Sequence, residues 1–178
     1  DSNYGVNYPA NIGEAFGYGA EFAASGPLSE NFELLFSASY NKYSFSENFQ
    51  SSPDTSTDIK GNQLPDAPEL MIKSALSYYL DRWTFTPSAR YTSSRYGDVA
   101  NTQKIDAFTL LDLDVSYRAD SFLGSNNALF RLTATNLTNE KYISTILSAD
   151  NALAADGTAS TYQTGAPFGA YLSLNLKY

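Results

Sequence analysis

The last eleven residues of the chain alternate strictly between apolar and mostly polar side chains. The apolar set is Phe168, Ala170, Leu172, Leu174, Leu176 and Tyr178, and the other set is Gly169, Tyr171, Ser173, Asn175 and Lys177. Successive side chains of a strand point to opposite faces, so this period of two predicts a strand with one apolar and one mostly polar face. Its length suits a tilted crossing of a lipid bilayer.

The same alternation recurs in six earlier segments, which span residues 16–24, 32–41, 70–80, 83–91, 111–118 and 127–138. A helical spacing fits none of them better. The sequence therefore predicts an all-β chain of seven strands. Pro87 lies on the apolar side of the fourth strand and cannot donate a ladder hydrogen bond, which predicts a bulge or a local bend there.

Short and long connectors alternate between these strands. The short ones are residues 26–31, Asp81-Arg82 and about 120–127, and the long ones are about 47–68, 97–107 and 139–167. This alternation is typical of antiparallel up-and-down transmembrane β-barrels. Aromatic residues near the strand ends, among them Tyr40, Phe45, Trp83 and Tyr117, fit interfacial girdles, although general β-propensity would place them there too.

Composition excludes several kinds of chemistry. The chain has no Cys and no His, so disulfides, thiol or Ser-His-Asp catalysis and the usual zinc, haem and iron–sulfur sites cannot be built. We expect no enzyme, no metal and no cofactor. A net charge of −8 argues against nucleic acid as a partner.

Hydropathy does not decide between a soluble and a membrane protein. Mean hydropathy is −0.31, but a transmembrane barrel also averages to a mildly polar sequence. No secretory leader opens the chain, so we expect a mature or internal start.

Four segments resemble, in order, the carboxy-terminal part of TonB-dependent outer-membrane receptors. They are Gly17–Phe22 with the following Gly26-Pro27-Leu28, then Gly61–Pro68 (GNQLPDAP), then Asn136–Tyr142 (NLTNEKY), and lastly the terminal strand ending in Tyr178. The resemblance implies that residues 1–178 are the carboxy-terminal segment of a barrel of about 22 strands. It also implies an amino-terminal plug domain, which this chain does not contain.

The resemblance further implies a function and partners. The family imports siderophores, cobalamin, carbohydrates or related nutrients across the outer membrane of Gram-negative bacteria, with energy from the TonB complex. Expected partners are outer-membrane lipid, the rest of the barrel with its plug, the TonB complex, and the barrel-assembly machinery, which would read the strand ending in Tyr178. Seven strands cannot close a barrel of the bacterial type, so we expect the chain to be part of something larger.

The candidate ligand contacts follow from the same resemblance. On the polar faces we single out Glu21, Lys73, Arg90 and Arg131, and in the loops Tyr96 and Tyr162, with Asp98 and Gln163 as further loop candidates. Charges inside a barrel commonly pair with one another, which is the competing interpretation for each of them.

Further charges share the polar faces, namely Asp112, Asp114 and Arg118. Asp112 and Asp114 stand about 7 Å apart on one strand face, and we favour pairing with Arg131 over catalysis.

Two other functions stay open at this point. A self-contained eight-stranded barrel acting as an anchor or adhesin would need residues 1–10 as an additional strand. A soluble ligand-binding barrel would need its apolar face inside.

Overall fold

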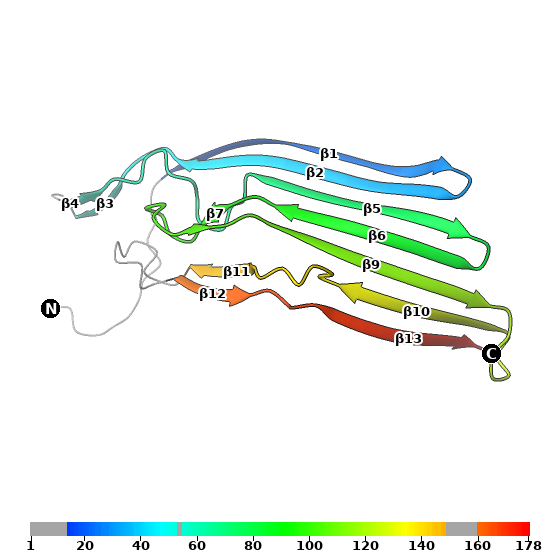
Figure 1. Ribbon diagram of the computed structural model, residues 1–178. Coiled ribbons are helices and arrows are strands. Elements are labelled where there is room, and N and C mark those ends of the chain that lie inside the picture. Colours follow the sequence, from blue (N-terminus) through cyan, green and yellow to red (C-terminus); the bar gives the residue numbers. More distant parts are fainter. Residues whose placement is uncertain (1–13, 53–54, 149–159) are drawn as a thin grey trace.

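The computed structural model describes residues 14–52, 55–148 and 160–178. Its main element is one antiparallel sheet of seven strands, in the order β1-β2-β5-β6-β9-β10-β13 (Figure 1). These strands are β1 (Ala15–Ser29), β2 (Phe32–Phe45), β5 (Leu70–Leu80), β6 (Trp83–Thr92), β9 (Phe108–Ala119), β10 (Asn127–Thr135) and β13 (Gly169–Lys177). The seven predicted strands and their up-and-down order are confirmed. Neighbours in sequence are neighbours in the sheet.

The pairing registers place the predicted apolar sets of all seven strands on one face. Across successive strands the register aligns Phe22 with Ala38, Leu34 with Leu76, Tyr78 with Phe85, Tyr117 with Phe130, and Leu132 with Leu172. A slip by one residue would move a whole strand's apolar set to the other face. The sheet therefore has one apolar face and one polar face along its full width.

Nothing in the described part of the chain covers the apolar face. Phe22 is 61% exposed and Leu172 is 78% exposed, and there is no second layer of strands over them. A soluble protein rarely leaves so much contiguous apolar surface open. No helix among the described residues is long and apolar enough to cross a membrane.

Aromatic rings form a continuous row across the apolar face, near the end of the sheet that carries the short turns. The ring centres of Phe32 and Tyr78 lie 4.7 Å apart, as do those of Trp83 and Tyr117. Trp83 and Tyr117 thus lie where an interfacial girdle requires them. Phe45 does not, because it is buried among loop residues.

The connectors differ from prediction in two ways. Residues 26–29 were expected to be a turn, but β1 continues to Ser29 and leaves only Glu30-Asn31 between the strands. An irregularity between Pro27 and Ser29 shifts the register there, which lets the strand accommodate the proline.

The long connectors are not plain loops, because each contains a short antiparallel strand pair. The pairs are β3 (Phe49–Ser52) with β4 (Thr55–Thr57), β7 (Arg95–Tyr96) with β8 (Lys104–Ile105), and β11 (Ile143–Ser148) with β12 (Ser160–Thr164). We call the three segments 46–69, 93–107 and 136–168 the loop rim. All three leave the same end of the sheet, and the carboxy-terminal residue lies at the opposite end with the short turns (Figure 1).

The sequence predicted a bulge or a local bend at Pro87, and the bulge is wrong. Pairs between β5 and β6 are missing around Pro87, but the ladder keeps one register from Ala75–Ser88 to Tyr78–Phe85. On its other side Pro87 pairs in register with Leu113. The strand therefore omits the ladder contacts that proline cannot make and does not take up an extra residue.

The two faces can be tested with a matched pair of neighbouring residues on β2. Ala38 lies on the apolar face between Phe22 and Ile72, and Ser39 lies on the polar face between Glu21 and Met71. We expect Ala38→Arg to destabilise the protein by about 2–4 kcal/mol, because the charge would enter lipid near mid-strand of the expected barrel. Ser39→Arg serves as the control and should cost much less. Unfolding of the complete protein in lipid vesicles measures both losses, and equal losses would contradict the face assignment.

Candidate functional site

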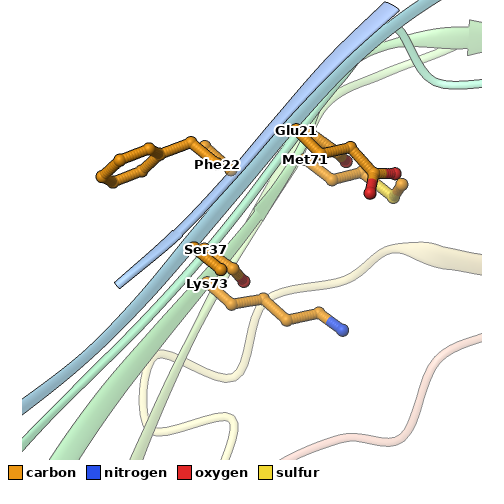
Figure 2. A pocket seen from close by; sticks show the side chains of 8 residues that line it. Glu21, Phe22, Ser37, Met71 and Lys73 are labelled. Carbon is orange, nitrogen blue, oxygen red and sulfur yellow. The ribbon is translucent and has the colours of Figure 1, made fainter. Parts of the chain in front are cut away.

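The polar face carries four of the predicted contact residues. Glu21 lies on β1, Lys73 on β5, Arg90 on β6 and Arg131 on β10. Glu21, Ser37, Met71 and Lys73 project from one side of the sheet while Phe22 projects from the other (Figure 2). The first group lines a shallow hollow of about 370 Å³. Side chains far apart in sequence thus share one open surface.

Lys73 and Arg90 are brought directly opposite each other by the pairing of β5 with β6. Both side chains are exposed. Neither has an ion-pair partner within the described ranges. Like charges in this arrangement are unfavourable unless an anion neutralises them.

A second hollow, of about 460 Å³, joins this cationic pair to the loop rim. Its lining includes Lys73, Arg90, Arg95, Asp66 and Tyr142. The Tyr142 ring contacts the Phe108 ring in a tilted arrangement, with ring centres 4.4 Å apart, and so brings the segment after β10 against β9. The hollow therefore lies where the polar face meets the loops.

Arg95 is almost fully buried in this region, with 2% exposure. Its Nε donates to Asp66 Oδ1 at 2.6 Å, and its Nη2 donates to the carbonyl of Ile143 at 3.0 Å. Its guanidinium also lies over the Phe108 ring, 6.0 Å from the ring centre. In this way Arg95 connects all three segments of the loop rim.

Sequence reasoning missed Arg95, and only its neighbour Tyr96 was singled out. No local pattern marks a buried arginine, since Arg is rarely buried without a partner and the partner here is 29 residues away. Asp66 lies inside the Gly61–Pro68 element, so the resemblance located it without assigning it a role.

The predicted pairing of Arg131 is confirmed for one carboxylate. Arg131 Nε donates to Asp114 Oδ2 at 2.6 Å, and Thr133 donates to the same oxygen at 2.7 Å. Asp112 does not face Arg131, because its Oδ1 accepts the backbone N–H of Asn136 at 2.7 Å. Both aspartates therefore have structural partners.

The loop tyrosines lie in the rim. Tyr162 on β12 donates a hydrogen bond to the Gln103 side chain. The Tyr96 carbonyl accepts the N–H of Asp66, and its ring is half-buried. Of the other loop candidates, Gln163 uses its carbonyl to accept the Ser144 hydroxyl at 3.1 Å.

Asp98 organises the turn that positions Gln103. Its carboxylate accepts the N–H of Gln103 at 2.8 Å and both the N–H and the hydroxyl of Thr102. Burial alone would raise the pKa of Asp98, but these hydrogen bonds to the ionised form outweigh it and hold the pKa below its ordinary value. The ionised carboxylate is thus part of the rim's structure.

The first two rim segments are also held together by amide side chains. Asn101 Oδ1 accepts the N–H of Gln63 at 2.7 Å while its Nδ2 donates to the Gln63 carbonyl at 2.8 Å. Asn62 Nδ2 donates to the Val99 carbonyl at 2.9 Å. Beneath these bonds Phe45, Ile59 and Val99 form a small apolar cluster.

Asn136, the first residue of the NLTNEKY segment, ends β10 with a positive φ of 51°. Its Nδ2 donates to the carbonyls of Glu140 and Ala166, at 3.0 and 2.9 Å, and its Oδ1 accepts the N–H of Glu140 at 2.8 Å. Asn139 Oδ1 accepts the N–H of Phe168 just before β13. The motif therefore closes the base of the third rim segment.

A family model for the TonB dependent receptor-like β-barrel matches residues 1–139. The chain belongs to the TonB-dependent receptor family. This receptor chain is thus a segment of an outer-membrane β-barrel.

Individual relatives agree. A probable TonB-dependent siderophore receptor, PiuA, from Acinetobacter baumannii is 25% identical over 174 residues, which is 95% of this chain and 21% of that protein. The ferrichrome outer membrane transporter/phage receptor of Escherichia coli is 30% identical over 138 residues, 74% of this chain and 17% of that protein. The receptor chain spans about a fifth of the length of these relatives.

Solved structures show the same fold. The crystal structure of the siderophore receptor PiuA from Acinetobacter baumannii aligns with a TM-score of 0.76 at 23% identity, over 94% of this chain and 22% of that one. The predicted barrel segment is therefore confirmed. The segment 1–10, on which an eight-stranded alternative depends, lies outside the described residues.

The Asp98 turn gives a pH-dependent prediction. Because its pKa is lowered in the folded state, Asp98 contributes stability above the ordinary carboxyl pKa of 3.8, and this contribution is lost as pH falls through the folded value. We expect Asp98→Asn to lower the unfolding temperature of the receptor near pH 7. The difference from wild type should shrink below about pH 4. A difference that is constant from pH 7 to pH 3 would contradict this role.

The three hydrogen bonds of the Asn136 side chain give a stability prediction. Asn136→Ala removes three side-chain hydrogen bonds and puts a less tolerant residue at a positive φ, so we expect a loss of about 2–4 kcal/mol. Asn175→Ala, at an exposed position on β13, is the control. Denaturant unfolding of the receptor measures both, and limited proteolysis should show cleavage within 136–168 in the first variant. If Asn136→Ala is as stable as Asn175→Ala, these hydrogen bonds do not stabilise the third rim segment.

Proposed function

We propose that the complete protein imports a ferric siderophore across the outer membrane, and that this chain forms seven consecutive strands of its barrel wall. The observation that carries the proposal is family membership together with a relative that matches nearly the whole chain and is named a siderophore receptor. Energy would come from the TonB complex, which would act on a plug domain inside the barrel.

Each face of the sheet has a role in this proposal. The apolar face, with Phe22 and Leu172 exposed, would meet outer-membrane lipid. The polar face would line the lumen and contact the plug and the passing solute. Glu21, Lys73, Arg90 and Arg131 would then be wall residues, and Tyr96 and Tyr162 would belong to the entrance.

The terminal strand would have a further partner. We propose that the barrel-assembly machinery reads β13 and Tyr178 during insertion. Supporting this, β13 is an edge strand whose apolar side chains are open, with Leu172 and Tyr178 each 78% exposed.

Transport fits the polar face better than catalysis does. The two carboxylates that could have formed an acid/base pair are held by Asn136 and by Arg131 with Thr133. A general acid or base needs a carboxylate free to exchange a proton with a substrate. We therefore propose that the protein is not an enzyme.

The alternative functions have less support. An anchor or adhesin built on a closed eight-stranded barrel would need residues 1–10 as a strand that pairs with β13, and those residues lie outside the described part of the chain. Import of cobalamin is the stronger rival. The vitamin B12 transporter BtuB of Photobacterium profundum is 35% identical, but over only 38% of this chain.

Uptake measurements test the proposal. Cells that lack the gene should lose TonB-dependent uptake of radioactive iron supplied with siderophores extracted from the iron-starved source bacterium. A plasmid copy should restore that uptake. Labelled cobalamin, measured in parallel, should enter both strains equally. If the cells without the gene keep iron uptake but lose cobalamin uptake, the siderophore assignment is replaced by cobalamin import. If neither uptake changes, import of both nutrients is refuted.

A further inference from the structure

We propose that the hollow bounded by Lys73, Arg90 and Arg95 binds a carboxylate that this chain does not itself supply. The inference rests on the proposed function in one respect, which is that the polar face lines the lumen of a barrel. It goes beyond that function by assigning an anion site to three named cations. Lys73 and Arg90 were each predicted from the sequence as candidate ligand contacts, whereas Arg95 was not.

The charge balance of the hollow favours an added anion. Three cations and a single carboxylate, that of Asp66, line it. That carboxylate is already bonded to Arg95 Nε at 2.6 Å. Lys73 and Arg90 therefore have no ion-pair partner within the described residues, and the Glu21 carboxylate lies with Lys73 in the adjoining hollow without pairing to it. An external anion would remove the repulsion between these directly opposed residues.

Two of the other arginines do have a carboxylate partner among the described residues. Arg131 is paired with Asp114 on the next strand, and Arg82 is paired with Asp120 at the short-turn end. The sheet thus supplies carboxylates to some of its cations. It supplies none to Lys73 and Arg90 among the residues described.

A buried donor of Arg95 also lacks a partner among the described residues. Arg95 Nη1 is buried and has no hydrogen-bond partner among the described residues, although Nε and Nη2 of the same side chain are both bonded. A buried donor without a partner is costly, and such atoms commonly mark an ion or group that the structure does not include. Arg95 lines the same hollow as Lys73 and Arg90.

A carboxylate matches these donors. The planar guanidinium presents paired N–H groups in the geometry of a carboxylate, and charge-assisted bonds of this kind are stronger than neutral ones. Tyr142 and Ser144 also line the hollow and carry hydroxyl groups. The carboxylate could come from an acidic side chain of the plug or from the imported solute, and the experiment separates these two sources.

The test uses the complete purified receptor and three single substitutions. Lys73→Gln and Arg90→Gln remove one charge each at exposed positions, where the fold should tolerate them. Arg118→Gln is the matched control, because Arg118 is also an exposed cation on the polar face but lines a different hollow near the short turns. Arg95 is left unchanged because its replacement would disturb the loop rim.

Two readouts are taken for each protein, namely the affinity for malonate by calorimetry and the midpoint of plug unfolding. If the solute supplies the carboxylate, wild type binds malonate and Lys73→Gln and Arg90→Gln each weaken binding by about tenfold, while Arg118→Gln does not. If the plug supplies it, malonate does not bind, and the same two variants lower the plug's unfolding midpoint relative to Arg118→Gln.

The proposal is overturned if Lys73→Gln and Arg90→Gln match Arg118→Gln in both readouts. Neither readout is uptake, so failure of this inference is distinguishable from failure of the import function. If the import assay fails but Lys73→Gln and Arg90→Gln still change malonate binding or plug unfolding, the proposed import function is rejected and the anion site is kept. If import is observed but the two substitutions have no effect in either readout, the anion site is rejected and the import function is kept.

Discussion

Backbone hydrogen bonding between consecutive strands is the constraint on which this structure depends. A strand in lipid must pair its N–H and C=O groups with a neighbouring strand, because no water is available to bond them. The order β1-β2-β5-β6-β9-β10-β13 meets this requirement except near Pro87, where β5 and β6 lose ladder pairs, and at the outer edges of β1 and β13. Those edges need the remaining strands of the receptor barrel. The same ladders fix the register, and the register separates an apolar face from a polar one.

A different kind of stabilisation holds the loop rim. Few apolar side chains are buried there, and the segments are connected mainly by polar groups such as Arg95, Asp98 and Asn101. Networks of this type are stable when every member is bonded and costly where one is not. The rim is thus specified by individual side chains, whereas the sheet is specified by a repeating pattern. Substitutions in the loop rim should therefore disturb only the nearby loop contacts, whereas a shift of strand register should disturb the whole sheet.

The polar face combines satisfied and unsatisfied charges. Arg131 with Asp114 needs nothing further, whereas Lys73 opposite Arg90 lacks a counter-ion in the part of the chain described. Since both kinds lie on one surface, charge type alone does not identify a contact residue. Their cross-strand neighbours make the difference, and this surface is the one that the proposed plug and solute would meet.

The sequence by itself determined the strands, their two faces and the family, because side-chain alternation is a local consequence of strand geometry and needs no knowledge of distant residues. The Asp114–Arg131 pair also followed, since adjacent strands bring nearby segments together. The sequence did not predict the burial of Arg95, the hydrogen bonds of the Asn136 side chain or the short strand pairs in the long connectors. Arg95 bonds to Ile143, 48 residues away, and Asn136 bonds to Ala166, 30 residues away. Contacts at such separations leave no local periodic signal, so only the tertiary structure decided which loop residues meet.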